Sequence, residues 1–337
     1  MYESGITVII PIYNSGKYLD EMLDSVYNQT FEDYNVVLIN DGSSDNSEDI
    51  ALKYVKKNSN TKYIYQKNKG VSEARNTGIA EISKKYTLFL DSDDYINKKM
   101  FEKMYEKAER VQADIVMCSY KTIYDNCSKT EEVHLNMDEN NIYSNTQVME
   151  MMLKMKIEGQ LWNKMFLSKS LVDFHIKFER GRIIEDLFPV VSQVSRAEKI
   201  VYIDEPLYNY RQNSMSLLHS NKELDVMRDQ VFAYKKIAEL VKEHNIVSKE
   251  IYSFFIAFTE ASNIKKCVEM NLKCNNDIYK KYEIDNMSIK DIFISKVSIK
   301  VKIKLCLFKM RILHVFYYLS VNIGKMRRCS ALFIKTE

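Results

Sequence analysis

The sequence is poor in the residues and patterns that mark several common protein classes. Its 337 residues include 8 Gly, 3 Pro and 1 Trp, which excludes collagen-like and low-complexity chains. The 6 cysteines form no CxxC pair and have no His at zinc-finger spacing, so we interpret them as scattered reduced thiols in a cytoplasmic protein. Neither G-x-G-x-x-G nor G-x-x-x-x-G-K-[ST] occurs, so the phosphate cradles of dinucleotide-binding and P-loop proteins are missing.

Long apolar runs are also lacking. The longest one near the carboxyl end, 312–323, has 12 residues and includes His314, whereas a transmembrane helix needs about 20. The amino-terminal apolar run is short, follows Glu3 and reaches Pro11, so we do not interpret it as a signal peptide.

Charge is unevenly distributed along the chain. Residues 296–337 contain ten Lys or Arg and one acid, which gives this tail a charge of +9 and the rest of the chain −6. Nucleic-acid binding usually needs a basic face on the folded body as well, so we expect no nucleic-acid partner. The tail alternates basic with apolar residues and then becomes aromatic. This pattern fits a peripheral segment on an anionic membrane surface, or else a packing or oligomerisation helix with solvated lysines.

The first 119 residues alternate β-rich runs with helical patterns. Strands are expected at Ile6–Ile12, Val36–Ile39, Tyr63–Tyr65, Thr87–Leu90 and Ile115–Ser119. Helices are expected at Lys17–Gln29, around Ile50–Val55, at Val71–Ile82 and at Asn97–Val111. This alternation predicts an α/β fold with a doubly wound, mostly parallel sheet and helices on both of its faces.

The regular alternation of expected strands and helices ends at about residue 120. Residues 120–145 look irregular, and a helix with an acidic start is expected over Ile183–Val194. Two short strands are expected at Ile200–Ile203 and Leu207–Arg211, and a helical pattern runs from Glu223 to about Lys273.

Polar residues follow three of the expected strands. They are Pro11-Ile12-Tyr13-Asn14, Asn40-Asp41-Gly42-Ser43 and Asp91-Ser92-Asp93-Asp94. Ligands of open α/β sheets bind outside the carboxyl ends of the strands, so we expect these three segments to meet at one rim.

The last of these segments places three carboxylates within four residues. In a partly buried rim they repel one another unless a cation offsets their charge, and carboxylate oxygens suit Mg²⁺ or Mn²⁺. The alternative is a solvated acidic turn at the start of the next helix.

Two further features are ambiguous when taken alone. Arg75, within Gly70-Val71-Ser72-Glu73-Ala74-Arg75-Asn76-Thr77-Gly78, is either a surface helix charge or a bidentate phosphate partner. Glu185 and Asp186 are either helix-start acids stabilised by the macrodipole or functional carboxylates. Adjacent helical residues point in different directions, so at most one of the two faces a given substrate.

Together these segments resemble glycosyltransferase family 2, whose members have the GT-A fold. The resemblance covers roughly residues 5–215 and rests on five motifs in order: Val8-Ile9-Ile10-Pro11-Ile12-Tyr13-Asn14, Leu38-Ile39-Asn40-Asp41-Gly42-Ser43-Ser44-Asp45, the Gly70–Gly78 segment, Phe89-Leu90-Asp91-Ser92-Asp93-Asp94 and Glu185-Asp186. Asn40 departs from the family, which often has a second Asp there. The resemblance implies a GT-A catalytic domain over 1–217, with a nucleotide-sugar-binding half at 1–119 and an acceptor and catalytic-base half at 120–217. A mainly helical extension with the basic tail would follow over 218–337.

The resemblance also implies roles for individual residues. The expected nucleotide-sugar-binding residues are Pro11, Ile12, Tyr13, Asn14, Asp41, Arg75, Asp91, Ser92, Asp93 and Arg211. Of these, Arg211 is expected from its position and not from the resemblance: Asn209-Tyr210-Arg211 and Ser214–Ser216 follow the helix of the acid pair and two strands, where they would close over the diphosphate or else form an ordinary strand end. Asp41 would accept from the uracil N3–H, and Asp93 or Asp94 would bind the metal ion. Asp186 matches the catalytic base, and Glu185 would orient the acceptor or the base.

The activity implied is an inverting, metal-dependent transfer from a UDP-sugar to a saccharide, with Mn²⁺ or Mg²⁺ as cofactor, in surface polysaccharide or related glycan synthesis. If the tail contacts the inner face of the cell membrane, a lipid-linked saccharide is the expected acceptor. Two alternatives remain. One is a non-catalytic relative that binds nucleotide-sugar or glycan. The other is a nucleotidyltransferase, for which no triphosphate cradle is found. Trp162 and its neighbours are expected to shape the sugar pocket, whose preferred sugar no short motif reveals.

Overall fold

The computed structural model describes residues 2–124, 129–212 and 223–269, together with 292, 295–299, 302, 303, 305 and 306. The chain divides into two compact units, residues 1–229 and 230–337. The boundary expected between residues 217 and 218 lies outside the described residues, as do Ser214–Ser216 and residues 307–337 of the basic tail. In the part of the chain that is described, no helix combines the length and apolar character needed to cross a bilayer.

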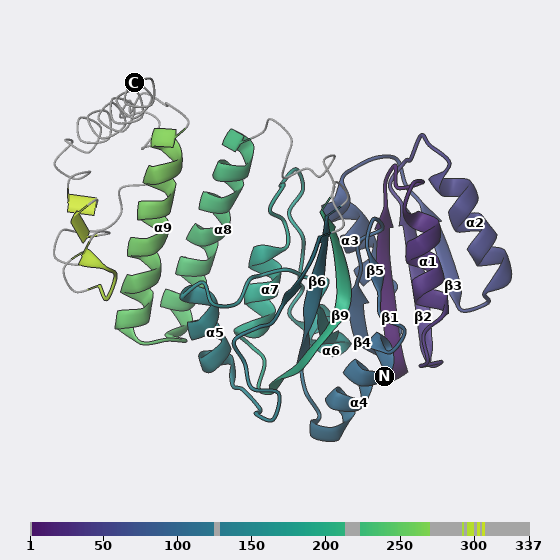
Figure 1. The fold of residues 1–337 in the computed structure, drawn as a ribbon, viewed down its shortest axis with the longest axis horizontal. Coiled ribbons are helices and arrows are strands. Elements are labelled where there is room, and N and C mark those ends of the chain that lie inside the picture. The colour runs from purple at the N-terminus through teal and green to yellow at the C-terminus, as the bar shows by residue number, and fades with distance from the viewer. Residues whose placement is uncertain are drawn as a thin grey trace, which may run out of the picture. The chain divides into compact units, whose positions relative to one another are not determined.

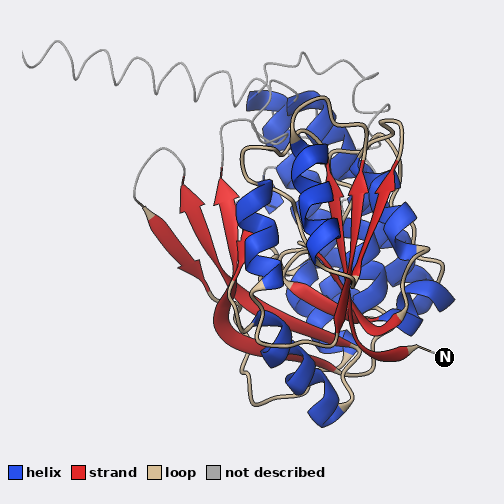
Figure 2. Cartoon of the chain, turned by 90° about the vertical axis from the view of Figure 1, so that its right-hand side faces the viewer, coloured by secondary structure: helices blue, strands red, loops and turns tan. Residues whose placement is uncertain are grey.

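One mixed sheet of nine strands organises the first unit (Figures 1 and 2). The strands are β1 (Glu3–Ile12), β2 (Tyr34–Asn40), β3 (Thr61–Tyr65), β4 (Lys84–Phe89), β5 (Tyr95–Ile96), β6 (Ile115–Tyr124), β7 (Thr130–Val133), β8 (Lys164–Leu167) and β9 (Ile200–Gln212). Their spatial order is β3-β2-β1-β4-β8-β6-β9-β5, and β7 pairs with β6. β3, β2, β1 and β4 are parallel, as are β6 and β9, whereas β8 is antiparallel to both of its neighbours. The predicted α/β class and the parallel amino-terminal strands are confirmed.

Nine helices lie among the described residues between 2 and 269. They are α1 (Leu19–Tyr27), α2 (Ser47–Lys57), α3 (Val71–Ile79), α4 (Met100–Val111), α5 (Asn145–Leu153), α6 (Ser168–Asp173), α7 (Leu187–Val194), α8 (Glu223–His244) and α9 (Lys249–Glu269). α8 begins in the first unit and continues into the second, where Tyr234 packs edge-to-face on Phe255 of α9, with ring centroids 5.6 Å apart.

Helices cover both faces of the sheet, as Figure 2 shows. Ile6, Val8 and Ile10 of β1 belong to a fully buried cluster that also contains the apolar faces of α1, α2 and α4. On the opposite face α3 packs so closely that a Cβ added at Gly78 would overlap Ile9. A strand buried on both faces needs apolar residues at consecutive positions, which explains the run Val8–Ile12 in β1.

Three local expectations were wrong. Residues 120–145 do not stay irregular, because β6 continues to Tyr124 and β7 pairs with it. The two short strands expected after residue 200 are one strand, β9, with register shifts near Ser119 of β6 where the pairing is irregular. The helix expected to begin at Ile183 begins at Leu187, so the Glu185–Asp186 pair precedes it.

Candidate active site

The loop after β1 is held against the loop after β2. Pro11 and Ile12 are buried at the end of β1, whereas Tyr13 is 52% exposed beyond it. Asn14 has a positive φ of 50°, and its backbone N–H donates to Ser43 Oγ at 3.1 Å. The first predicted segment therefore ends in an exposed aromatic ring beside the second segment.

Asp41 is buried directly after β2 and accepts hydrogen bonds on both carboxylate oxygens. Oδ1 accepts from Gln66 Nε2 at 2.6 Å and from the Lys69 N–H at 2.9 Å, and Oδ2 accepts from the Gly70 N–H at 2.7 Å. Gly70 has a φ of 89°, which side-chain-bearing residues rarely adopt, and it opens α3. A carboxylate offers about four lone-pair sites, so these three donors leave room for one more, such as an imide N–H.

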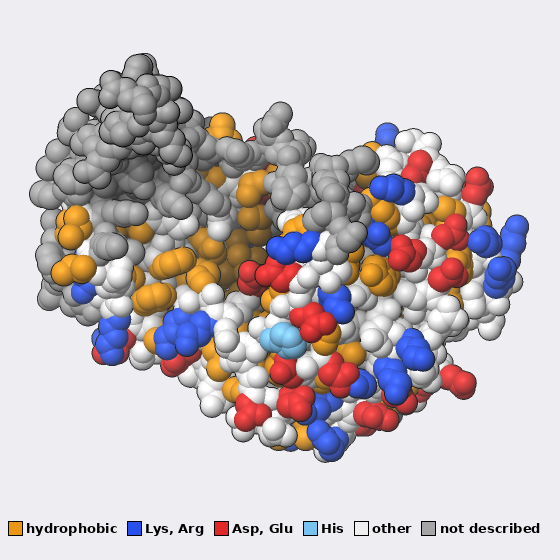
Figure 3. All heavy atoms as spheres, viewed as in Figure 1, with side chains coloured by type: hydrophobic (Ala, Val, Ile, Leu, Met, Phe, Trp, Pro, Cys, Tyr) orange, Lys and Arg blue, Asp and Glu red, His pale blue; other side chains and the backbone are white. Residues whose placement is uncertain are grey.

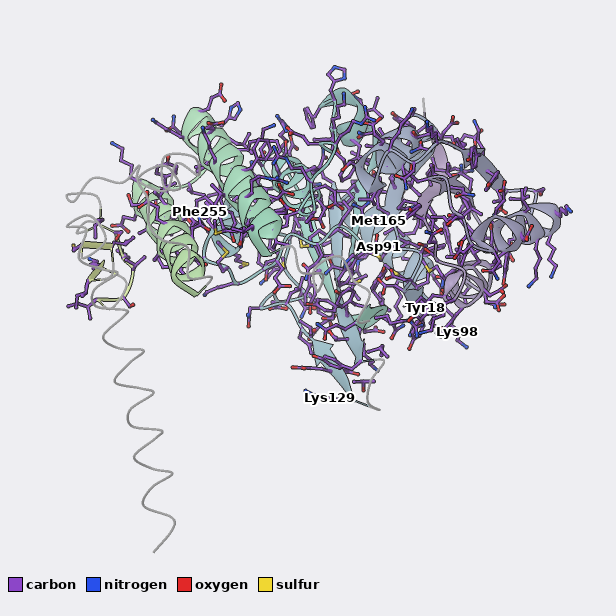
Figure 4. The ribbon with its side chains drawn as sticks, turned by 90° about the horizontal axis from the view of Figure 1, so that it is seen from above. Tyr18, Asp91, Lys98, Lys129, Met165 and Phe255 are labelled. Carbon is purple, nitrogen blue, oxygen red and sulfur yellow. The ribbon has the colours of Figure 1, made fainter. Side chains whose placement is uncertain are left out.

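The acidic turn after β4 adjoins the same loops. Asp91, labelled in Figure 4, follows the strand, and its side chain is 30% exposed. The Ser92 hydroxyl lies 2.6 Å from the Ser15 hydroxyl in a buried contact, which fixes the turn to the loop after β1. Asp93 is partly exposed, whereas Asp94 is buried. The predicted convergence of the three loops at one rim is thus present.

Asp94 and Asp93 differ in what surrounds them. Asp94 Oδ2 accepts from the Tyr208 hydroxyl at 2.5 Å, and Oδ1 accepts from the Arg211 N–H at 2.6 Å. Burial raises the pKa of Asp94 well above its usual range, and the nearby carboxylates of Asp93 and Asp91 raise it further. Asp94 therefore ties the turn to β9, while the carboxylate of Asp93 lies nearer to solvent.

The side chain of Arg211 also secures this turn. Its Nε donates to the Asp93 carbonyl at 3.0 Å, and its Nη2 binds Glu21 Oε2 at 2.6 Å. The guanidinium lies over the ring of Tyr18, 4.7 Å from the centroid. These contacts position Arg211 next to the acidic turn, and its predicted diphosphate contact remains a prediction.

The donor set at this turn fits a hard divalent cation. It offers carboxylate oxygens, which such a cation prefers, and burial together with the neighbouring carboxylates of Asp93 and Asp91 raises the pKa of Asp94. No group of three or more ligating side chains occurs among the described residues. A site that takes one or two protein carboxylates and completes its coordination with substrate phosphates and water does not need such a group.

Arg75 of α3 connects the acidic turn to the distant acid pair. It is 4% exposed, its Nη2 donates to Asp91 Oδ1 at 2.8 Å, and its Nη1 binds Glu185 Oε1. Burial alone would lower the pKa of Arg75, but Glu185 and Asp91 raise it, so the guanidinium remains charged. Arg75 is therefore a buried cation held between carboxylates, and the surface-charge interpretation is wrong.

Glu185 and Asp186 lie immediately before α7, with Asp186 as its N-cap residue. Burial raises the pKa of Glu185 to about 7; Arg75 acts against this rise, and Asp186 adds to it. Burial also raises the pKa of Asp186, which Arg75 and Lys164 oppose and Asp91 reinforces. A carboxylate with a raised pKa is a stronger base than an ordinary one.

Lys164 is a charged residue near this site that the sequence analysis did not single out. It is fully buried on β8, and its Nζ donates to the Gln160 carbonyl at 2.5 Å and to Asn163 Oδ1 at 2.8 Å. Burial lowers its pKa to about 8, and Asp186 opposes that shift. Its signal in the sequence is a lysine inside the apolar segment Leu161-Trp162-Asn163-Lys164-Met165-Phe166.

Trp162 is packed among tyrosines from two strands. Its ring stacks on Tyr208 with centroids 4.4 Å apart and on Tyr210 at 5.4 Å, and it meets Tyr120 edge-to-face at 4.8 Å. Trp162 is only 7% exposed, so an effect on the sugar pocket would act mainly through these tyrosines.

The fold and the site together match the class of proteins that have the GT-A fold. The ends of β1, β2 and β4 bring an exposed ring, the buried Asp41 and an acidic turn to one rim, and Arg75 of α3 connects that turn to the acid pair before α7. On the face drawn in Figure 3, acidic and basic side chains are interspersed over the first unit.

Comparison with known proteins agrees with this class. Residues 7–169 match the glycosyl transferase family 2 model. The chain is 28% identical over 307 residues to the glycosyltransferase GlyA of Streptococcus pneumoniae, covering 86% of this chain and 44% of GlyA. It is 32% identical over 217 residues to the uncharacterized glycosyltransferase EpsJ of Bacillus subtilis, covering 63% of this chain and 62% of EpsJ. The chain thus spans less than two thirds of either relative.

The fold is that of Staphylococcus aureus TarS. Residues 1–349 of TarS in complex with UDP-GlcNAc superpose with a TM-score of 0.73 at 18% identity, covering 94% of this chain and 92% of that one. The chain is thus similar to glycosyl transferase family 2 over residues 7–169, and it has the fold of TarS.

Proposed function

We propose that this protein transfers a sugar from a UDP-sugar to a saccharide acceptor, with inversion at the anomeric carbon. The observation that carries the proposal is the Arg75 bridge, which brings the acidic turn after β4 and the acid pair before α7 to one place. The fold that the chain shares with TarS, whose complex contains UDP-GlcNAc, supports a UDP-sugar as the donor.

The uridine would lie across the loops after β1 and β2. Tyr13 offers an exposed ring, and Asp41 is held rigidly with room for one further hydrogen bond. The three donors to Asp41 keep its carboxylate oriented, which suits a single contact to the imide N–H of uracil.

The diphosphate would lie against the acidic turn. Asp93, with Asp91 beside it, would hold Mn²⁺ or Mg²⁺, which when bound offsets the negative charge on the departing diphosphate. Asp94 stays inside the protein, where Tyr208 and Arg211 keep the turn in place.

Asp186 would remove the proton from the attacking acceptor hydroxyl. Its raised pKa makes it a better base near neutral pH than an ordinary aspartate. The hydroxyl oxygen forms the new bond to C1 as the bond from C1 to the diphosphate oxygen breaks on the opposite face, which inverts the anomeric centre. Glu185, paired with Arg75, would orient the base and the acceptor.

A UDP-release screen tests this function. Purified full-length protein is incubated with UDP-GlcNAc, UDP-GalNAc, UDP-glucose and UDP-galactose, with Mn²⁺, with Mg²⁺ or with EDTA, and with oligosaccharide acceptors. We expect metal-dependent UDP release from at least one donor, and its loss in Asp186→Asn. UDP release from no donor while UDP binding is retained would favour a non-catalytic binding protein instead.

A further inference from the structure

The segment that carries Glu185 and Asp186 has no regular secondary structure of its own. It runs from the end of α6 at Asp173 to the start of α7 at Leu187, and we name residues 174–186 the acid-pair segment. A side chain on such a segment keeps a precise position only if neighbouring elements fix the backbone.

Helix α3 holds the middle of the acid-pair segment. The Asn76 side chain exchanges two hydrogen bonds of 2.9 Å with the backbone of Phe178, and Ser72 Oγ donates to the Glu179 carbonyl at 2.7 Å. With Arg75 bound to Glu185 and Glu73 Oε1 3.6 Å from Arg180 Nε, four residues of α3 therefore contact the segment.

Asp229 of α8 binds the acid-pair segment at a second place, just before Glu185. Its carboxylate is completely buried, Oδ1 accepts from Arg182 Nη1 at 2.8 Å, and Oδ2 accepts from the Ile183 backbone N–H at 2.6 Å. Arg228 Nε lies 3.2 Å from the same Oδ1. Both carboxylate oxygens of Asp229 thus accept hydrogen bonds from Arg182 and Ile183, which lie three and two residues before Glu185.

We infer that Asp229 is a positioning residue, which fixes the acid-pair segment so that Glu185 and Asp186 keep their places in the site. It touches neither donor nor acceptor and acts through the backbone at Ile183. The inference rests on the proposed function, because that function gives Asp186 its role. The hydrogen bonds by which Asp229 fixes the segment do not depend on it. Asp229 is on helix α8, which comes after the last of the five motifs in the sequence. The five motifs alone therefore do not contain every residue that shapes the site.

The loss of Asp229 should have a specific kinetic result. The donor-binding loops after β1, β2 and β4 make their contacts without Asp229, so UDP affinity and the donor KM should remain within about twofold of wild type. The value of kcat should fall about tenfold or more, because small displacements of a reacting group are costly. A general loss of folding would instead lower UDP binding together with kcat.

The experiment compares full-length wild type, Asp229→Ala, Asp229→Asn and Arg182→Ala, with Asp225→Ala as the matched control. Asp225 is on the same helix and pairs with Arg228 at 3.1 Å, but it is 47% exposed. Hydrogen exchange of the peptide containing Ile183 is measured together with kcat, donor KM and UDP affinity.

In Asp229→Ala we expect about 10- to 100-fold faster exchange at Ile183, as for the loss of a hydrogen bond to a charged group. Asp229→Asn keeps one acceptor and should lie between Asp229→Ala and wild type, Arg182→Ala should be milder than Asp229→Ala, and Asp225→Ala should match wild type. Unchanged hydrogen exchange at Ile183 in Asp229→Ala would overturn the inference. If the wild type is active, a kcat of Asp229→Ala equal to that of the wild type would also overturn it. If wild type releases no UDP from any donor, the proposed function fails, and the exchange at Ile183 still decides whether Asp229 holds the segment.

Discussion

Arg75 and Glu185 form a buried ion pair although they are 110 residues apart in the sequence. The same guanidinium binds Asp91 at 2.8 Å, so a single side chain of α3 fixes the distance between the turn after β4 and the segment before α7. The two carboxylates have exposed fractions of 10% for Glu185 and 30% for Asp91. The cation offsets their repulsion, and it makes one site from two motifs that are remote in the chain.

Replacing Arg75 should therefore reduce both stability and activity. Arg75→Met leaves Glu185 buried without its cation, and breaking a buried pair from one side costs about 3–5 kcal/mol. Arg75→Lys keeps the charge but cannot bridge two carboxylates in the same geometry. Urea denaturation should show a loss of stability in both variants, larger in Arg75→Met.

Lys62→Met is the control for this prediction. Lys62 binds Glu81 but is 56% exposed, and such surface pairs contribute about 0–1 kcal/mol. If Arg75→Met is no less stable than Lys62→Met, the bridge does not hold the site together.

The second prediction concerns the base. Asp186→Asn keeps the size of the side chain but cannot accept a proton, so kcat should fall about 10²- to 10⁴-fold. UDP affinity, measured by titration calorimetry, should remain within about twofold of wild type. Asp173→Asn, at a 47% exposed position of α6, should behave as wild type. A parallel loss of UDP binding in Asp186→Asn would show that Asp186 is not acting as the base.

The third prediction is a pH dependence of stability from Glu185. Burial raises the pKa of this carboxyl from 4.5 to about 7 in the folded protein. Between these two values the folded state holds the proton and the unfolded state does not, so stability falls as the pH rises. The loss should be about 2 kcal/mol from pH 4.5 to pH 7 once the coupling to Asp186 reduces it. Glu185→Gln should flatten this part of the stability profile, and a slope equal to that of wild type would contradict the assignment.

The fourth prediction has the opposite sign and concerns Lys164. Burial lowers the pKa of its ammonium from 10.5 to about 8 in the folded protein. Above pH 8 the unfolded chain keeps a proton that the folded chain has lost, so this group makes stability rise with pH. The rise should be about 2 kcal/mol between pH 8 and pH 9.5.

Lys164→Met should remove that rise, and Lys169→Met, at a 67% exposed position, should leave it in place. Chemical denaturation at half-unit pH steps measures both. A rise that persists in Lys164→Met would show that another group titrates in this window.

The fold and the meeting of three loops at one rim could be predicted because both depend on local patterns. The near-continuous apolar run of β1 predicts a strand covered on both faces, and parallel strands bring the residues after β1, β2 and β4 to one rim. Asp41 and Asp91 were therefore found as members of one site without any knowledge of their partners.

Other features depend on contacts that local patterns do not encode. Arg75 has the same helical neighbours whether it is exposed or buried, so only the fold reveals its bridge. Asp94 was expected as a second candidate for the metal, and its contacts to Tyr208 and Arg211 come from β9, more than 100 residues later. The start of α7 was placed too early because acids are common in the first turn of a helix, whereas here Arg75 and Asp229 hold the residues before it.

The most direct measurement is a crystal structure of the full-length protein with UDP and Mn²⁺. We predict uracil N3 within hydrogen-bond distance of Asp41, the metal ion between the diphosphate and Asp93, and Asp186 facing the position of the sugar C1. A UDP molecule bound elsewhere, or a diphosphate remote from both Asp93 and Asp186, would contradict this prediction.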